Sequence, residues 1–221
     1  MAHRLFSGAQ IRCIENYRCF DLSRCIRKRS LSCRIDLGGF MELILASQSP
    51  RRHEIMRWMG IPCASEVCTE PEAVPEGLSC PQTVMHLAKQ KAAFALHLHP
   101  HACVIGADTV VCLNGQIIGK PKSESDAIDT LKRMQGQTHD VYTGVAVLKD
   151  GYEDVRFVRT SVHFRPMTDQ EIRWYVSTGE PMDKAGSYGI QGLASVFVDS
   201  IEGDYFPCIV TLTIILVEIP G

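Results

Sequence analysis

Residues 103–118 read CVIGADTVVCLNGQII, two apolar runs joined at Asn114-Gly115. Asn-Gly tolerates the positive φ angles of a type I′ turn, and this pair between two strand-like runs is a strong hairpin signal. A second pair of runs, 141–148 and 155–164, flanks Asp150-Gly151 and predicts another hairpin. Both hairpins would place antiparallel strands in the sheet.

The segments around these hairpins alternate between strand and helix signals. Leu43–Ala46 is a short apolar run typical of a buried strand, and Ser49-Pro50 is typical of an N-cap followed by the first residue of a helix that Gly60 ends. Because strands and helices alternate but hairpins are present, we predict an α/β fold with a mixed sheet. Further helices are expected over 82–98, over 123–136 and from the capping box at Thr168-x-x-Glu171 to Gly179, with a final strand near 195–201.

Length and composition restrict the class of protein. At 221 residues, 45% of them hydrophobic, the chain can form one α/β domain or two small lobes that share a core. A formal net charge of −2 gives no support for a nucleic-acid-binding surface. No apolar stretch reaches the roughly 18–20 residues of a membrane helix, since the apolar tail from Cys208 to Pro220 is shorter and contains Glu218. We therefore expect no binding to nucleic acid or membrane.

Residues 1–40 differ in charge from the rest of the chain. They hold eight Lys and Arg residues against three acidic ones, a balance of +5. An acid-poor leader that bears Arg and Ser is typical of a mitochondrial transit peptide, and a disordered extension is the alternative that we favour. We divide the chain into a basic extension, disordered or targeting, over 1–40 and a folded domain over 41–221. The expected location is the cytoplasm, with the mitochondrion as the alternative.

The ten cysteines are a high number for a chain of this length. No two of them form a CxxC pair, and a chain with a full hydrophobic core has little need of disulfides. The cysteines are therefore predicted to be reduced thiols and not a disulfide framework.

The segment Ser47-Gln48-Ser49-Pro50-Arg51-Arg52 lies between a predicted strand and a predicted helix. Free N–H groups and the helix dipole attract anions at a helix start, and guanidinium groups match phosphate oxygens. Arginine in the first turn opposes the dipole, a local cost that a bound anion would offset. The alternative interpretation is a solvated arginine pair on a surface helix.

Two further charged residues border the first hairpin. Asp108 ends an apolar run, where a carboxylate can hold a divalent cation or take a proton from water; a turn residue or cap is the alternative. Lys120, in Gly119-Lys120-Pro121, follows the hairpin that Asp108 begins, so strand pairing predicts that Lys120 lies near Asp108 and neutralises phosphate charge. The alternative for this pair is a surface ion pair, worth about 0–1 kcal/mol.

The stretch 179–192 is rich in glycine, with Gly179, Gly186, Gly189 and Gly192. This density indicates tight backbone geometry or close approach to a ligand. Gln191 presents both a donor and acceptors, which suits the imide edge of uracil or thymine. A structural loop that closes two lobes is the alternative.

Taken together, these segments resemble the Maf family of nucleotide pyrophosphatases, named for septum formation. Each motif alone is weak, but the set follows the family's order and spacing over roughly residues 42–206 and is specific. The matching pieces are LASQSPRR at 45–52, LAKQKA at 87–92, GADTVV at 106–111, GKP at 119–121, YTGV at 142–145 and the segment from GEP at 179 to QG at 192.

The resemblance implies a two-lobed α/β fold of the Maf/ITPase-like type, with a mixed twisted sheet around a central cleft and commonly a homodimer. It implies hydrolysis of a nucleoside triphosphate between the α and β phosphates, giving a monophosphate and pyrophosphate, with Mg²⁺ or Mn²⁺ as cofactor. Arg51, Thr109 and Gln191 are substrate-binding positions that match the branch preferring dTTP and UTP.

The resemblance also implies a role for each remaining site residue. Asp108 would be the general base or metal-linked carboxylate that activates water. Glu72 would help to bind the metal; it is placed by its distance from Gly60 and Lys91, with Glu70 as the fallback. The residues expected to hold the triphosphate are Ser47, Arg51, Arg52, Lys91 and Lys120.

The C-terminal end departs from the family pattern. After Gly203-Asp204-Tyr205-Phe206 the family continues Asn-Val-Val-Gly-Leu-Pro and a closing helix, whereas this chain continues Pro207-Cys208-Ile209. Loss of a terminal helix would expose core, so a weakly folded or inactive chain is one expectation. Two other functions stay open: a pyrophosphatase for modified purine nucleotides such as methylated GTP, and a catalytically weak nucleotide-binding regulator of cell division.

Overall fold

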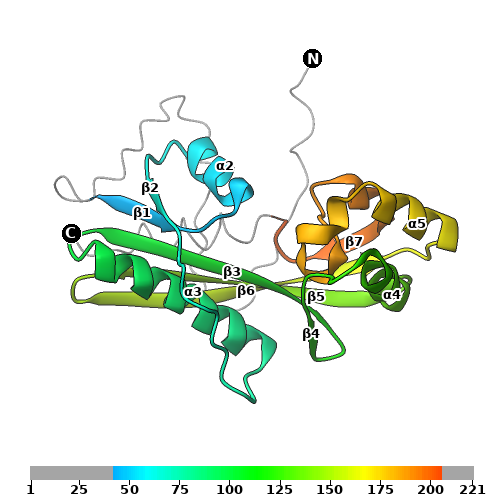
Figure 1. Cartoon of the computed structure of the whole chain (residues 1–221), viewed down its shortest axis with the longest axis horizontal. Coiled ribbons are helices and arrows are strands. Elements are labelled where there is room, and N and C mark those ends of the chain that lie inside the picture. The colour runs from blue at the N-terminus through cyan, green and yellow to red at the C-terminus, as the bar shows by residue number, and fades with distance from the viewer. Residues whose placement is uncertain (1–41, 206–221) are drawn as a thin grey trace. The chain divides into compact units, whose positions relative to one another are not determined.

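The strands form one mixed sheet (Figure 1) in a computed structural model that describes residues 42–205. The sheet order is β2-β1-β3-β5-β6-β7, and β4 pairs with β3 away from this path. The predictions made for residues 1–40 and for the tail after Phe206 lie outside the described residues. The strands are β1 (Leu43–Ala46), β2 (Ala64–Glu66), β3 (Cys103–Leu113), β4 (Gln116–Ile118), β5 (Thr138–Lys149), β6 (Tyr152–Phe164) and β7 (Val198–Glu202).

Strand pairing confirms the predicted mixed sheet. β1 pairs in parallel with β2 and β3, and all the other pairs are antiparallel. The turn between β3 and β4 has φ angles of 51° at Asn114 and 79° at Gly115, as a type I′ turn requires. Gly151 in the second hairpin has a φ of 70°. Local turn chemistry therefore sets the two hairpins, β3–β4 and β5–β6.

Four α-helices and three short 3₁₀ helices accompany the sheet in residues 42–205. Helix α5 begins with the predicted capping box, in which Glu171 N donates to Thr168 Oγ1 at 3.2 Å and Thr168 N donates to Glu171 Oε2 at 2.8 Å. The helices are α2 (Pro50–Trp58), α3 (Cys80–Leu98), α4 (Glu124–Met134) and α5 (Asp169–Ser177), with η1 (Glu180–Asp183), η2 (Ala185–Ser187) and η3 (Leu193–Phe197). None of these helices is long and apolar enough to cross a membrane.

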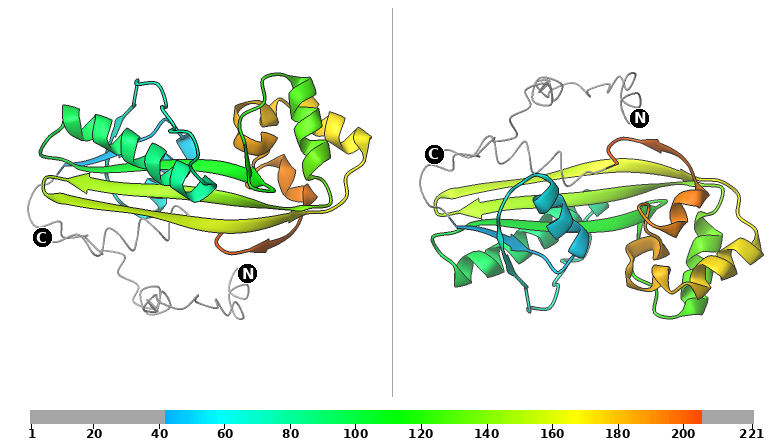
Figure 2. Two further views of the ribbon diagram at one scale, coloured as in Figure 1. Left: turned by 90° about the horizontal axis from the view of Figure 1, so that it is seen from below. Right: turned by 90° about the horizontal axis from the view of Figure 1, so that it is seen from above.

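Helix α3 packs along the sheet against β3, β5 and β6 (Figure 2). Two glycines permit this close approach. A Cβ at Gly106 would collide with the carbonyl oxygen of Ala88, and one at Gly144 would collide with that of Val84. The helix backbone thus lies directly on strands β3 and β5, which fixes the position of every side chain that α3 presents to them.

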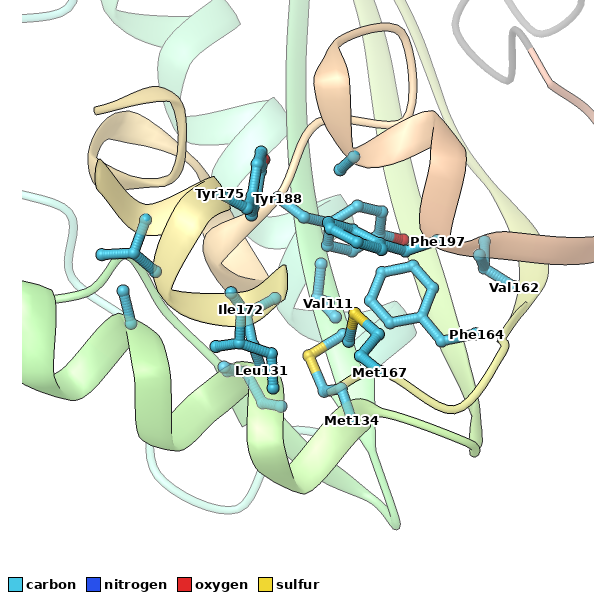
Figure 3. Packing of buried hydrophobic residues seen from close by; sticks show 14 of the residues in the cluster. Val111, Leu131, Met134, Val162, Phe164, Met167, Ile172, Tyr175, Tyr188 and Phe197 are labelled. Carbon is cyan, nitrogen blue, oxygen red and sulfur yellow. The ribbon is translucent and has the colours of Figure 1, made fainter. Parts of the chain in front are cut away.

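A hydrophobic core lies where α4, α5 and the 3₁₀ helices pack on the ends of the long strands (Figure 3). Edge-to-face contacts join its aromatic rings, with Phe164 and Tyr188 at a centroid distance of 4.8 Å and Tyr175 and Phe197 at 5.5 Å. This core anchors the glycine-rich stretch, because Tyr188 belongs to that stretch. The labelled members are Val111, Leu131, Met134, Val162, Phe164, Met167, Ile172, Tyr175, Tyr188 and Phe197.

The structure differs from the predicted elements at two places. The short strand β2 had no prediction; its first two residues are exposed and carry no apolar alternation. The last strand begins at Val198 and not near residue 195, because Leu193–Phe197 forms η3 and buries Phe197 in the core. Both differences arise from packing partners distant in sequence.

The prediction that the cysteines are reduced thiols is wrong for one pair, because Cys80 and Cys112 form a disulfide. Cys80 is the first residue of α3 and Cys112 lies on β3, 32 residues further along the chain. Packing of α3 on the sheet brings their Cα atoms to 6.7 Å, within the usual range for a disulfide. The other described cysteines, Cys63, Cys68 and Cys103, are free.

Candidate active site

The predicted site residues gather at one interruption in the pairing of β3. Pairing with β1 ends where Ala46 faces Gly106, and pairing with β4 begins where Ile118 faces Val111. Of the strands within 42–205, none pairs with that edge of β3 over residues 107–110, while β5 pairs along the other edge. Asp108 and Thr109 occupy this stretch, and consecutive strand side chains point to opposite faces.

On the face toward α3, a lysine joins two carboxylates. Lys91 Nζ lies 2.5 Å from Asp108 Oδ1 and 2.9 Å from Glu72 Oε1. The side chains of Asp108 and Lys91 are 14% and 18% exposed, whereas that of Glu72 is 56% exposed. We call these three residues the Lys91 cluster. It brings together the predicted water-activating carboxylate, a predicted phosphate ligand and a predicted metal ligand.

The Lys91 cluster is strongly ionic. Burial lowers the pKa of Lys91, but the charge and hydrogen bond of Asp108, followed by those of Glu72, outweigh burial and raise that pKa above its usual value. Lys91 is therefore an ammonium group at neutral pH. It balances the two neighbouring carboxylates, which would otherwise repel each other.

Helix α3 also fixes the loop that carries Glu72. Gln90 Nε2 donates to the carbonyl oxygen of Pro71 at 2.9 Å, and His86 Nε2 lies 2.8 Å from that of Ala73. These contacts hold the backbone on both sides of Glu72 against one helix. In the described structure Lys91 pairs with Glu72 and not with the fallback residue, Glu70.

On the opposite face of β3, a second group surrounds Arg52. Arg52 donates from Nη1 to Ser47 Oγ at 3.1 Å and from Nη2 to Thr109 Oγ1 at 3.3 Å. Ser47 directly follows β1 and is buried, and its Oγ also accepts from Ser49 N at 3.2 Å. We call Ser47, Arg52 and Thr109 the Arg52 cluster. These contacts bring the start of α2 against β3.

Arg51 reaches the glycine-rich stretch. Its Nη1 donates to Gln191 Oε1 at 2.7 Å, across 140 residues of sequence. The charge of Arg51 also contributes to the lowered pKa of Asp183, after the larger effect of the hydrogen bond from Lys184. The hydrogen bond to Gln191 thus places Arg51 beside the stretch 179–192, which brings the predicted phosphate-binding and base-binding residues together.

Lys120 does not form the predicted pair with Asp108. The ion-pair partner of Asp108 in the described structure is Lys91, since α3 packs directly on β3. Lys120 is exposed and lies two residues beyond the end of β4, and the preceding Gly119 accepts a hydrogen bond from Gly186 N at 3.0 Å. Lys120 therefore adjoins the glycine-rich stretch and not the carboxylate.

Sequence reasoning missed two polar residues of the site. Thr143 Oγ1, on β5, lies 3.1 Å from Thr109 Oγ1 and is buried. His53 Nε2 lies 3.0 Å from the carbonyl oxygen of Ser47. Thr143 belongs to the YTGV motif, which matches the family pattern but gave no indication of a role for this residue. Nothing in the sequence distinguished His53 from an ordinary helix residue.

The donor set fits a divalent metal that substrate phosphates would complete. Asp108 and Glu72 offer carboxylate oxygens, the hard ligands that Mg²⁺ prefers, and both contact the same Lys91 Nζ. Mg²⁺ is commonly held by one or two carboxylates together with substrate phosphates. Within residues 42–205, no group of three or more His, Cys, Asp or Glu side chains could hold a metal ion unaided.

Comparison with known proteins identifies the class to which this arrangement belongs. The family model described as Maf-like protein matches residues 42–216, and the chain belongs to this family. The match extends past Phe206 into the segment where the sequence departs from the family pattern. Every predicted site residue lies within the matched range.

The most similar curated relatives are bacterial proteins, each named dTTP/UTP pyrophosphatase. The one from Symbiobacterium thermophilum is 45% identical over 165 residues, which cover 75% of this chain and 85% of that protein. Those from Bacillus pumilus and Desulforamulus reducens are 45% and 44% identical and are each covered to 87%. Among solved structures, the Ham1 protein of Staphylococcus aureus matches 56% of this chain and 71% of its own at 16% identity, with a TM-score of 0.38, a likeness too weak to bear on function.

Proposed function

We propose that this chain hydrolyses UTP and dTTP to the corresponding monophosphate and pyrophosphate. One observation carries the proposal: the Lys91 cluster and the Arg52 cluster meet at Asp108-Thr109, on opposite faces of the stretch of β3 that has a strand partner, β5, on one edge only. Carboxylates for a metal and a water molecule thus adjoin cationic donors for phosphate oxygens. The names of the curated relatives support the same reaction and substrates.

The cationic residues are suited to a triphosphate. Arg51 and Arg52 stand in the first turn of α2, where their fork-shaped donors and the free N–H groups of the helix start suit phosphate oxygens. Lys91 and Lys120 add two further positive charges. Pyrophosphate leaves with developing negative charge, and donors held in place before the reaction stabilise that charge without reorganising.

Asp108 is the group that directs water in this proposal. Its Oδ1 is bound to Lys91, which fixes the orientation of the carboxylate and leaves Oδ2 to accept a proton from water. Asp108 and Glu72 are the residues that would hold Mg²⁺ or Mn²⁺, which when bound supplies charge neutralisation and activates water. No covalent intermediate on the protein is needed.

Gln191 is the residue that we propose distinguishes bases. Its side chain is exposed, and the Arg51 contact holds its amide oxygen toward the start of α2. An amide offers one donor and one acceptor side by side, which complement the O4 and N3–H of uracil and thymine.

We also retain two earlier predictions, a homodimer and a cytoplasmic location. Light scattering on the purified chain would test the first, and imaging of a tagged chain would test the second.

The test is pyrophosphate release from a panel of nucleoside triphosphates with Mg²⁺ or Mn²⁺. We expect UTP and dTTP to be the best substrates and Asp108→Asn to lower kcat by about 10²–10⁴-fold, the usual contribution of a general base. Asp154→Asn is the matched control, because Asp154 is also an ion-paired strand residue, 16% exposed, but pairs with Arg156 on β6.

Two results would contradict the proposal. Turnover in Asp108→Asn equal to that of Asp154→Asn would remove Asp108 from the mechanism. If a folded wild-type chain bound nucleotide but released no pyrophosphate, the result would favour a nucleotide-binding regulator over an enzyme. A preference for modified purine nucleotides would instead indicate a pyrophosphatase for those substrates.

A further inference from the structure

The carboxylate of Glu180 spans the glycine-rich stretch from its beginning to its end. Glu180 is the first residue of η1, and its Oε1 accepts from Tyr175 OH at 2.9 Å. Its Oε2 accepts from Leu193 N at 2.9 Å, thirteen residues later in the chain. One side chain thus connects helix α5 to the segment directly after Gln191.

The backbone on both sides of Gln191 packs against the side chains of Glu180 and Lys184. A Cβ at Gly192 would collide with the carboxylate of Glu180, so a larger residue there would displace that side chain. A Cβ at Gly189 would lie 2.8 Å from Lys184 Cε, and Lys184 Nζ donates to the carbonyl oxygen of Glu180 at 2.8 Å. Glu180 and Lys184 therefore contact the two glycines that bracket Gln191.

Tyr175, which donates to Glu180, is held in the hydrophobic core. Tyr175 is fully buried in the core of α4, α5 and the 3₁₀ helices (Figure 3), where it packs against Phe197. Burial, followed by the hydrogen bond to Glu180, raises the pKa of Tyr175, so its hydroxyl stays protonated and donates to Glu180. The path from the core to the base-binding residue is thus Tyr175, Glu180, Gly192 and Gln191.

We propose that Glu180 is a positioning residue that sets base selectivity through Gln191 without touching the nucleotide. The inference rests on the proposed function of Gln191. Glu180 receives two donors at once, which a carboxylate satisfies with its two oxygens. A glutamine in its place has a single acceptor oxygen, so either Tyr175 OH or Leu193 N would face its NH₂ group and the link from α5 to residue 193 would weaken. Gln191 would then sample several orientations.

The experiment compares Glu180→Gln with Glu171→Gln. Glu171 is the matched control, because it is also a half-buried carboxylate in this region and also accepts hydrogen bonds, from Thr168 and Arg165, but it caps α5 and does not contact the stretch 179–192. The quantity measured is kcat/KM for UTP divided by kcat/KM for CTP, which lacks the imide edge. Exchange of backbone amide hydrogens over 188–193 is measured in parallel without nucleotide.

We expect Glu180→Gln to lower the UTP/CTP ratio about tenfold, as for loss of one hydrogen bond to a charged group, mainly by raising KM for UTP. Amide exchange over 188–193 should rise in the same variant. Tyr175→Phe removes the hydroxyl that donates to Glu180 and that also forms a hydrogen bond with the backbone of Gly189, so it should change the ratio in the same direction. Adding Glu180→Gln to Gln191→Ala should leave the ratio of that variant unchanged.

The proposal is overturned if Glu180→Gln keeps the wild-type ratio, or if Glu171→Gln lowers the ratio equally, which would indicate a general loss of stability. A wild-type chain that releases no pyrophosphate would instead refute the proposed function. In that case the exchange measurement still decides the positioning role, since unchanged exchange over 188–193 in Glu180→Gln would refute it.

Discussion

At the scale of single residues, Lys91 holds two carboxylates close together. Two carboxylates in proximity repel each other. The ammonium group of Lys91 contacts both Asp108 and Glu72 and offsets this repulsion, so both carboxylates can face one metal ion in the proposed reaction. A lysine that neutralises phosphate in the proposed reaction therefore also prepares the site before substrate arrives.

His139 is a buried titratable residue that lies outside the proposed chemistry. Its Nε2 lies 2.7 Å from Tyr188 OH, and its ring makes edge contacts with Phe164 and Tyr188. Burial lowers the pKa of His139 from 6.5 to about 4. The imidazole is therefore neutral in the folded chain at neutral pH, and its structural role is to fill the core beside the glycine-rich stretch.

This lowered pKa predicts acid sensitivity. Above pH 6.5 the group is neutral in both folded and unfolded chains and has no effect on the pH dependence of stability. Between pH 6.5 and about 4 only the unfolded chain takes up the proton, so the free energy of unfolding should fall as pH falls, by on the order of 3 kcal/mol in total.

Urea unfolding at several pH values would measure this slope, and His139→Gln should remove it while leaving the slope below pH 4 in place. A wild-type free energy of unfolding that stays constant from pH 7 to 4.5 would show that His139 does not titrate in this way.

At the scale of elements, α3 organises the site. The helix presents Lys91 to β3, holds the loop around Glu72 through Gln90 and His86, and is linked to β3 by the Cys80–Cys112 disulfide. Its close contact with Gly106 and Gly144 leaves little room for it to shift. The geometry of the Lys91 cluster therefore depends on how this helix lies on the sheet.

The disulfide should stabilise this arrangement. Closing a loop with a separation of 32 residues restricts the unfolded chain, which by the chain-entropy relation is worth about 3–4 kcal/mol. We expect a reductant to lower the free energy of unfolding of the wild-type chain by about this amount and to leave Cys80→Ala/Cys112→Ala unaffected. Equal sensitivity of the two proteins to the reductant would contradict the structural role assigned to the disulfide.

At the scale of the whole described chain, the site is assembled from segments far apart in sequence. Ser47 to Arg52, Glu72, Lys91, Asp108-Thr109 and Gln191 come from different elements, each held by its own packing. A nucleotide that contacts several of them adds further links between these segments. Binding should therefore stabilise the chain as a whole.

A non-hydrolysable UTP analogue with Mg²⁺ tests this expectation. At a free concentration of one hundred times Kd it should raise the free energy of unfolding by about 2.7 kcal/mol, with a matching rise in Tm. Arg52→Ala should abolish most of the rise at the same concentration. Arg57→Ala is the control, because Arg57 is exposed in the last turn of the same helix. A rise in Tm that survives in Arg52→Ala would place the nucleotide elsewhere.

Much of the fold could be predicted because its signals are local. The Asn114-Gly115 turn, the capping box at Thr168 and the Pro50 helix start each act within a few residues, and all three are confirmed. Strand β2 and helix η3 could not be predicted in this way, because their conformations depend on β1 and on the core around Phe197.

The candidate site could be predicted in its members and less well in its contacts. Ordered motifs located Asp108 and Lys91, and spacing from Gly60 and Lys91 located Glu72. Hairpin geometry paired Asp108 with Lys120, whereas helix α3, which packs on the sheet, supplies Lys91. The disulfide was missed for the same reason, since only tertiary packing of α3 brings Cys80 to Cys112. The role of Glu180 likewise requires knowing that Leu193 returns to it.

The alternation of Asp108 and Thr109 across β3 makes the length of this strand as important as its composition. Deletion of Ala107 would shift the alternation by one residue. The carboxylate of Asp108 would then point toward Arg52, and each later residue of β3 would point to the opposite face from the one it occupies now, although every site residue would still be present. An in-frame insertion at the exposed Asn114-Gly115 tip would leave that alternation unchanged. Genetic variation in length should therefore be tolerated at the tip of this hairpin and not at its centre.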